Sequence, residues 1–147
     1  MRWIGVPVIL PDINVLVYAH RKESPRHAHA AEIVTQIATA LVPFALSSFV
    51  CNGFIRIVTN HRIYREPTPL KQALVFVESL IARPNCRQIE PSESHWLIFK
   101  QLLQETKATG NLVSDAYLAA IAIEHGCEIL TDDSDFSKFS MLKVQKL

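Results

Sequence analysis

Short apolar runs alternate along this chain with longer stretches in which apolar residues recur at helical spacing. The predicted strands are residues 8–10, 44–46 and 127–130, with weaker candidates at 87–89 and 142–144. Helical patterns cover residues 14–20, 24–40, 50–58, 70–83 and 115–125, and another follows Ser92 and ends before Gly110. Strands that alternate with helices of about 10 to 15 residues predict an α/β fold with a parallel central sheet flanked by helices.

Side chains that can cap a helix precede most of these helical patterns. The predicted caps are Ser24, Ser47 or Ser48, Thr68, Ser92 and Ser114, and two of them stand directly before a proline. Residues 115–125 are apolar almost all round, which predicts a central, buried helix that ends at Gly126.

Length and composition set the class of protein. The 147 residues predict one domain, residues 1–147, and the formal net charge of +1 provides no global positive field for nucleic acid. No apolar run reaches the roughly 18 residues of a membrane span, so a soluble protein without a membrane partner is expected. The three cysteines include no C-x-x-C pair, and reduced thiols in a cytoplasmic protein are the expectation.

Three of the fourteen acidic residues stand out by position. Asp12 follows the first predicted strand, Asp133 follows the last strong one, and Asp115 begins the most buried helix. In a parallel sheet these places meet at the carboxyl ends of the strands. Carboxylates that converge repel one another unless a cation neutralises them, and oxygen ligands suit Mg²⁺ or Mn²⁺. The pattern predicts a metal-dependent phosphodiester hydrolase.

Each of these acids, taken alone, also has a purely structural explanation, since an aspartate after a strand is often a turn residue and one at a helix start is often a cap. Alternation in an extended segment places Asp135 on the side of Asp133 and turns Asp132 away, so Asp135 is a candidate auxiliary acid. Asn14 and Thr131 are candidates to orient the carboxylates, although Asn14 can equally be a helix cap.

Four segments resemble motifs of PIN-domain ribonucleases, and in particular the VapC toxins of type II toxin-antitoxin systems. They are residues 12–17 (DINVLV), 53–60 (GFIRIVTN), 114–120 (SDAYLAA) and 130–136 (LTDDSDF), in the order of the family. The resemblance implies a PIN-like three-layer fold and a Mg²⁺-dependent, sequence-specific endoribonuclease. It also implies a cognate VapB-like antitoxin and a homodimer.

The chain departs from the family pattern at one acid. PIN nucleases usually carry a glutamate just before the 53–60 segment, at a position that corresponds to about Cys51, and no acid lies between Glu32 and Glu66. Cysteine is a poor ligand for Mg²⁺, and Asn52 offers only a neutral carbonyl oxygen. Weaker metal affinity is expected, and a catalytically weakened PIN fold that binds RNA or a protein is the alternative function.

Basic residues gather after this segment. Arg56 and Arg62, with His61 and Arg65, are candidate RNA contacts, and Tyr64 is a candidate for stacking on a base; a solvated helix end is the alternative. The histidines lack zinc spacing and the four glycines form no phosphate loop. A phosphotransfer protein with Asp12 as nucleophile is disfavoured, because Asn14 stands where its second acid would be.

Overall fold

The computed structural model describes residues 5–147, so the first four residues of the predicted domain lie outside the described part. The described residues form one parallel sheet with the strand order β3-β2-β1-β4-β5. The strands are β1 (Val8–Pro11), β2 (Phe44–Leu46), β3 (Cys86–Gln88), β4 (Cys127–Thr131) and β5 (Val144–Lys146). The helices are α1 (Ile13–His20), α2 (His27–Thr39), α3 (Ser48–Val58), α4 (Leu70–Ile81), α5 (His95–Thr106), α6 (Asn111–Glu124) and a short 3-10 helix, η1 (Ser134–Lys138).

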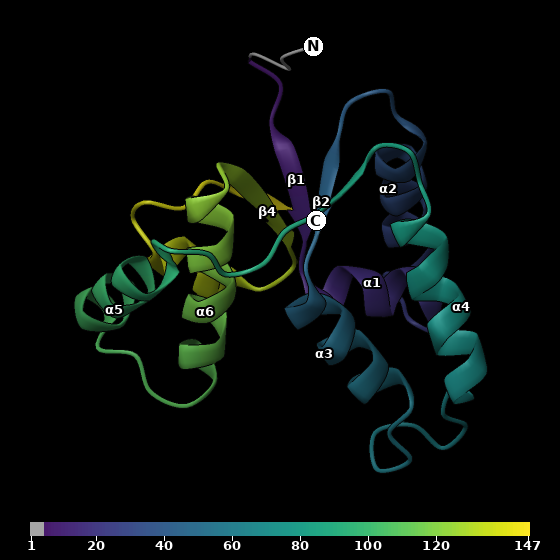
Figure 1. Cartoon of the computed structure of the whole chain (residues 1–147). Coiled ribbons are helices and arrows are strands. Elements are labelled where there is room, and N and C mark those ends of the chain that lie inside the picture. The colour runs from purple at the N-terminus through teal and green to yellow at the C-terminus, as the bar shows by residue number, and fades with distance from the viewer. Residues whose placement is uncertain (1–4) are drawn as a thin grey trace.

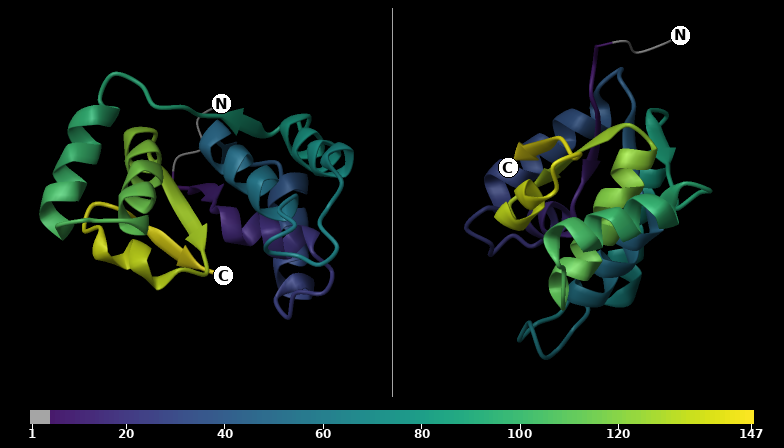
Figure 2. Two further views of the ribbon diagram at one scale, coloured as in Figure 1. Left: turned by 90° about the horizontal axis from the view of Figure 1, so that it is seen from below. Right: turned by 90° about the vertical axis from the view of Figure 1, so that its left-hand side faces the viewer.

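Helices cover both sides of this sheet. Figure 1 shows α5 and α6 on one side of β1 and β4, with α1 to α4 on the other, and the left view of Figure 2 shows the same separation. The predicted α/β class, a parallel sheet between helical layers, is confirmed. No helix of the described residues combines the length and the apolar character needed to cross a bilayer.

The core lies where the central strands meet α6. Leu10 of β1, Ala45 of β2 and Ile129 of β4 are fully buried. In α6, residues 118–122 are at most 1% exposed, which confirms the prediction of a buried central helix. Apolar side chains on both faces of the central strands hold the strand ends in fixed positions.

Two of the predicted caps, Ser24 and Thr68, do not cap a helix. Ser24 does not start α2, because its hydroxyl accepts a 3.1 Å hydrogen bond from the backbone N–H of Arg26 in a turn, and the helix begins only at His27. Thr68 precedes α4, but its hydroxyl faces His20 at 3.0 Å and Arg21 at 3.1 Å instead of the helix. Such short side chains satisfy whichever polar group is nearest, so sequence position alone does not select a cap.

The start of α5 also differs from the prediction, whereas that of α3 agrees with it. Ser92 lies before the helix, and its backbone N–H donates to Glu124 at 2.8 Å; α5 begins at His95. Ser47 caps α3 as predicted, since its hydroxyl accepts from the backbone N–H of Val50 at 3.2 Å. The predicted strands at 87–89 and 142–144 are shifted by one and two residues.

Helix α6 begins one turn earlier than predicted. Gly110 has φ of 60°, a conformation that costs glycine little, and the helix starts directly after it at Asn111. Ser114 is therefore an exposed residue inside the helix and not its cap. Asp115 lies in the second turn of α6, where it faces the ends of β1 and β4.

Candidate metal centre

The central strands β1 and β4 deliver two of the predicted acids to the same edge of the sheet. Pro11 pairs with Leu130 in the parallel register, and the backbone N–H of Asp12 donates to the Leu130 carbonyl at 2.8 Å. Asp12 is thereby fixed at the end of β1, and Asp133 follows two residues after the end of β4. This edge is where ligands bind in parallel α/β sheets.

Asp12 is buried and held at both carboxylate oxygens. The residue is 7% exposed; Oδ1 accepts from the backbone N–H of Ile13 at 2.7 Å, and Oδ2 accepts from the Thr131 hydroxyl at 2.7 Å. Burial raises the pKa of Asp12, the two hydrogen bonds lower it, and the nearby charge of Asp133 raises it again. The carboxylate therefore has a fixed orientation.

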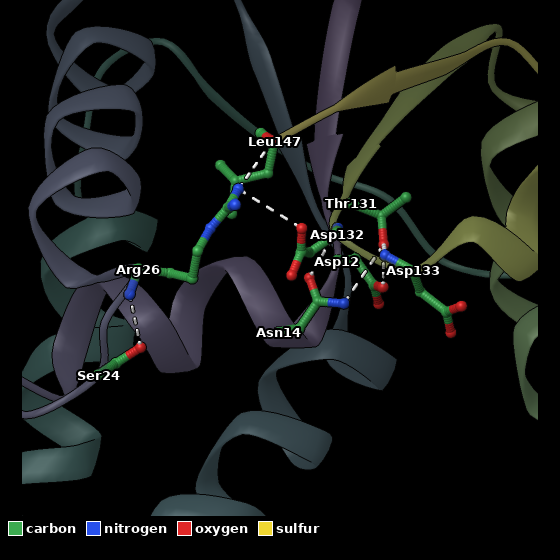
Figure 3. A network of polar contacts seen from close by, with 8 residues as sticks. All are labelled: Asp12, Asn14, Ser24, Arg26, Thr131, Asp132, Asp133 and Leu147. Carbon is green, nitrogen blue, oxygen red and sulfur yellow. Dashed lines mark hydrogen bonds and ion pairs between the residues drawn. The ribbon is translucent and has the colours of Figure 1, made fainter.

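Thr131 is the centre of a polar network between the two strand ends, drawn in Figure 3. Besides donating to Asp12, its hydroxyl oxygen accepts from the backbone N–H of Asp133 at 3.0 Å and from Asn14 Nδ2 at 3.3 Å. The Asn14 carbonyl oxygen in turn accepts from the backbone N–H of Asp132 at 3.3 Å. Asn14 and Thr131, the predicted auxiliary residues, thus belong to one network with Asp12 and Asp133.

Three carboxylates converge in front of this network. One oxygen each from Asp115, Asp133 and Asp135 lies within 4.8 Å of the other two. Asp133 caps η1 by accepting from the backbone N–H of Asp135 at 2.9 Å, so a helical turn, and not the predicted extended segment, brings these two acids together. Asp132 faces away, as predicted, and its carboxylate lies 3.4 Å from Arg26.

The protein balances the negative charge of this cluster only in part. The pKa of Asp115 is raised to about 7, first by burial and then by the carboxylates of Asp133, Asp12 and Asp135. Lys138 lowers this pKa, but its ammonium group lies 2.9 Å from Asp135 and is partly exposed. A cluster of acids with this electrostatic strain fits a bound cation, and its oxygen atoms fit a hard divalent ion.

The cluster differs from the predicted trio in one member. Asp115 and Asp133 come together as expected, but the third acid within 4.8 Å is Asp135 and not Asp12. Asp12 stands beside the cluster, since it raises the pKa of Asp115 and lines a pocket together with it. The Asp-x-Asp spacing in residues 133–135 is the sequence signal for this arrangement.

Cys51 lies outside the cluster. Its thiol is half-buried, and burial, followed by Cys86 and Glu90, raises its pKa to about 11. The thiol therefore stays protonated at neutral pH and is not a ligand for a hard cation. Helix α3 contributes no acid to the site.

The basic residues predicted to contact RNA are exposed. Arg56 lies on α3 and Arg62 in the turn after it, and neither forms an ion pair with any residue between 5 and 147. Tyr64 is different, because the Arg21 guanidinium lies over its ring at 3.9 Å from the centroid. One face of the Tyr64 ring is thus used within the protein, which weakens the prediction that Tyr64 stacks on a base.

Two residues near the acids were not anticipated. Arg26 donates to the Leu147 carbonyl at 2.7 Å and pairs with Asp132, so it ties the last residue of the chain to the end of β4. Tyr18 lines the pocket beside Asp12. The available signal for Tyr18 was its spacing, four residues after Asn14 on the same face of α1.

Comparisons with known proteins match this architecture over most of the chain. The family model described as "PIN domain" matches residues 9–141. VapC ribonuclease Mb2897 from Mycobacterium bovis is 40% identical over 132 residues, which cover 90% of each chain. Ribonuclease VapC25 from Mycobacterium tuberculosis is 35% identical over 136 residues, or 92% of this chain and 96% of the relative.

Solved structures with low sequence identity share the fold. VapBC-1 from nontypeable Haemophilus influenzae has a TM-score of 0.69 at 18% identity and covers 95% of this chain and 97% of that one. VapBC2 from Rickettsia felis, solved with a DNA fragment from the promoter, has a TM-score of 0.68 at 18% identity, with 95% and 98% coverage.

Proposed function

The chain belongs to the VapC ribonucleases of the PIN-domain family, and we propose that it is an endoribonuclease that hydrolyses RNA phosphodiester bonds with Mg²⁺, for which Mn²⁺ can substitute. The observation that carries the metal dependence is the cluster of Asp115, Asp133 and Asp135, whose carboxylates lie within 4.8 Å of one another and whose charge the exposed Lys138 beside Asp135 balances only in part.

Each acid has a role that its contacts support. Asp115 and Asp133 would hold the metal directly, with Asp135 as the third oxygen donor. Asp12, also proposed as a metal-binding and catalytic acid, is held in one orientation by Thr131 and Ile13 and faces the same edge of the sheet. Thr131 and Asn14 keep the two strand ends in register.

A divalent ion in such a site lowers the pKa of water and neutralises charge on a phosphodiester. The residues of the chain supply what the ion does not. The buried Thr131 hydroxyl holds the Asp12 carboxylate in one orientation. Arg56 and Arg62 are exposed cations for the RNA backbone, which the overall charge of +1 makes necessary.

The absent acid on α3 bears on the strength of metal binding. With Cys51 protonated, the metal would be held by fewer carboxylates than in family members that carry the glutamate. We expect a metal affinity weaker than theirs. A non-cleaving module that binds RNA or protein is the alternative outcome.

Regulation by a partner follows from the same family. Solved structures that share this fold are of VapBC proteins, and by extension a VapB-like antitoxin is the proposed partner of this chain in the cytoplasm, with a homodimer as its proposed assembly. Helix α4 presents Leu70, Leu74 and Val75 at 39% exposure or more, an apolar surface that suits a protein partner. Purification of a tagged copy of the chain from its native cells tests this pairing, and recovery of the tagged chain without a small co-purifying protein would contradict it.

The deciding experiment is cleavage of labelled RNA by the purified, antitoxin-free protein with Mg²⁺ or Mn²⁺. We expect cleavage that EDTA abolishes and that Asp115→Asn reduces by at least about 100-fold. Glu93→Gln, which removes an exposed acid outside the cluster, is the matched control and should cut like the wild type. Folded protein that cuts nothing with either metal would favour the binding module.

A further inference from the structure

An apolar pocket adjoins the proposed metal centre. Asp12 and Asp115 form part of its lining, and it has a volume of about 260 Å³. The remaining lining residues are Ile13, Asn14, Val17 and Tyr18 of α1 and Ile57 of α3. The pocket therefore begins at the acids and continues along an apolar wall between two helices.

This apolar wall does not suit the sugar-phosphate backbone of RNA, which is polar and charged. A nucleobase is the part of RNA with flat apolar faces, and proteins read single-stranded RNA by unstacking bases and placing them against aromatic rings. The volume is below the roughly 300–1,000 Å³ of sites for drug-sized ligands, which fits a single base. Continuity with the acids places that base next to the phosphate that is cut.

Tyr18 supplies the aromatic surface. The ring is partly buried, and its position is held through the backbone, where the Tyr18 carbonyl lies 2.9 Å from Nδ1 of His27. Burial and the nearby Asp132 raise the pKa of the phenol, which keeps its hydroxyl protonated as a donor. The ring thus offers a stacking face in the pocket, and its hydroxyl lies near Asp132.

Asn14 provides a polar group in the same pocket. Its amide nitrogen donates one hydrogen bond to Thr131 at 3.3 Å and its carbonyl oxygen accepts from the backbone of Asp132, which fixes the amide plane. A primary amide has two N–H donors, and the second makes no hydrogen bond with any residue between 5 and 147, so it is available to a base edge. A fixed donor beside an aromatic wall can prefer one base over another.

We propose that this pocket receives one nucleobase of the RNA, from a nucleotide adjoining the scissile phosphate, and that the base stacks on Tyr18. The inference rests on the proposed ribonuclease function and adds a determinant of its sequence preference.

The test uses an RNA oligonucleotide that the wild-type protein cuts with Mn²⁺, together with versions that carry an abasic nucleotide at each position flanking the cut. We expect one abasic version to lose roughly 10-fold to 100-fold in kcat/KM. Tyr18→Ala should show the same loss on the intact RNA and little further loss on that abasic version. Tyr18→Phe, which keeps the ring, should retain most of the activity.

Leu41→Ala is the matched control, since Leu41 is 89% exposed and precedes β2 at the opposite edge of the sheet. If Tyr18→Ala does not fold, the abasic series on the wild type and Ile57→Ala decide the question. Cleavage that is indifferent to every abasic position and to Tyr18→Ala would overturn the base pocket and leave the ribonuclease intact. No cleavage of any RNA would overturn both. A Tyr18→Ala effect confined to inhibition by a co-expressed antitoxin would make the pocket a protein-binding site and contradict the proposal.

Discussion

The hydroxyl of Thr131 donates a 2.7 Å hydrogen bond to Oδ2 of Asp12, and both side chains are buried. This bond joins residues 119 positions apart in the sequence and connects the ends of the two central strands. It also opposes the rise in the pKa of Asp12 that burial causes. The orientation of Asp12 therefore depends on β4, the strand that leads to Asp133 and Asp135.

Removing the Thr131 hydroxyl tests this dependence. Thr131→Val keeps the shape of the side chain but leaves a buried carboxylate oxygen without its donor. We expect a loss of about 1–3 kcal/mol in the free energy of unfolding, measured by urea titration, together with reduced RNA cleavage. Thr131→Ser retains the hydroxyl and should preserve most of both. Equal behaviour of the two variants would show that the hydroxyl has no such role.

Asp115→Asn should stabilise the metal-free protein. The pKa of Asp115 is raised from 3.8 to about 7, so the folded state binds this proton more tightly than the unfolded chain does. The resulting destabilisation is absent below pH 3.8, grows as the pH rises toward 7 and is complete above it. In EDTA the variant should thus exceed the wild type in stability at pH 7.5 and by less at pH 5. Urea titrations at both pH values measure the difference, and a wild type at least as stable at pH 7.5 would contradict it.

Metal binding should stabilise the wild type more than the variants that lack one of the clustered acids. Mn²⁺ binds the folded cluster and should raise the Tm of the wild type in a concentration-dependent way. Asp115→Asn and Asp135→Asn should each show a smaller shift, whereas Glu93→Gln should match the wild type. A full shift in Asp135→Asn would exclude Asp135 as a ligand and return the third position to Asp12.

Gly53 permits the close approach of α1 and α3. A Cβ at this position would lie 2.9 Å from Cγ1 of Ile13 and even closer to Cδ1, inside van der Waals contact. Gly53→Ala should cost about 1–3 kcal/mol and lower cleavage, because Ile13 directly follows Asp12. Adding Ile13→Val removes Cδ1 and should recover part of the stability. Thermal unfolding of the single and double variants measures this, and no recovery would locate the strain elsewhere.

Arg26 should contribute to stability through its contact with the backbone of Leu147. Its guanidinium joins the Leu147 carbonyl to Asp132, and 40% of the side chain is exposed. Arg26→Ala should lower the free energy of unfolding by about 1 kcal/mol, and Asp132→Asn should cost less because that ion pair is longer and screened by solvent. Urea titration compares the two, and a larger loss in Asp132→Asn would reverse their assigned importance.

Local chemistry accounts for the parts of the fold that the sequence predicts well. β2 and the cap at Ser47 agree with the prediction because an apolar run and an adjacent hydroxyl carry enough information within a few residues. The starts of α2, α5 and α6 do not, because capping groups compete for several partners and Gly110 begins α6 a turn early. Those choices depend on neighbours distant in the chain, such as Glu124 beside Ser92.

The same division holds for the site. The sequence by itself identified the acids at the strand ends and on the buried helix, since a parallel sheet brings the ends of its strands to one edge. Only the tertiary structure decided that Asp135 joins Asp115 and Asp133 while Asp12 is held apart by Thr131, and that Tyr18 borders a pocket beside them. The physical reason is that sequence spacing places a residue at one end of the strands with a precision of several ångströms. Metal ligation and base stacking depend on interatomic distances that differ by only about one or two ångströms.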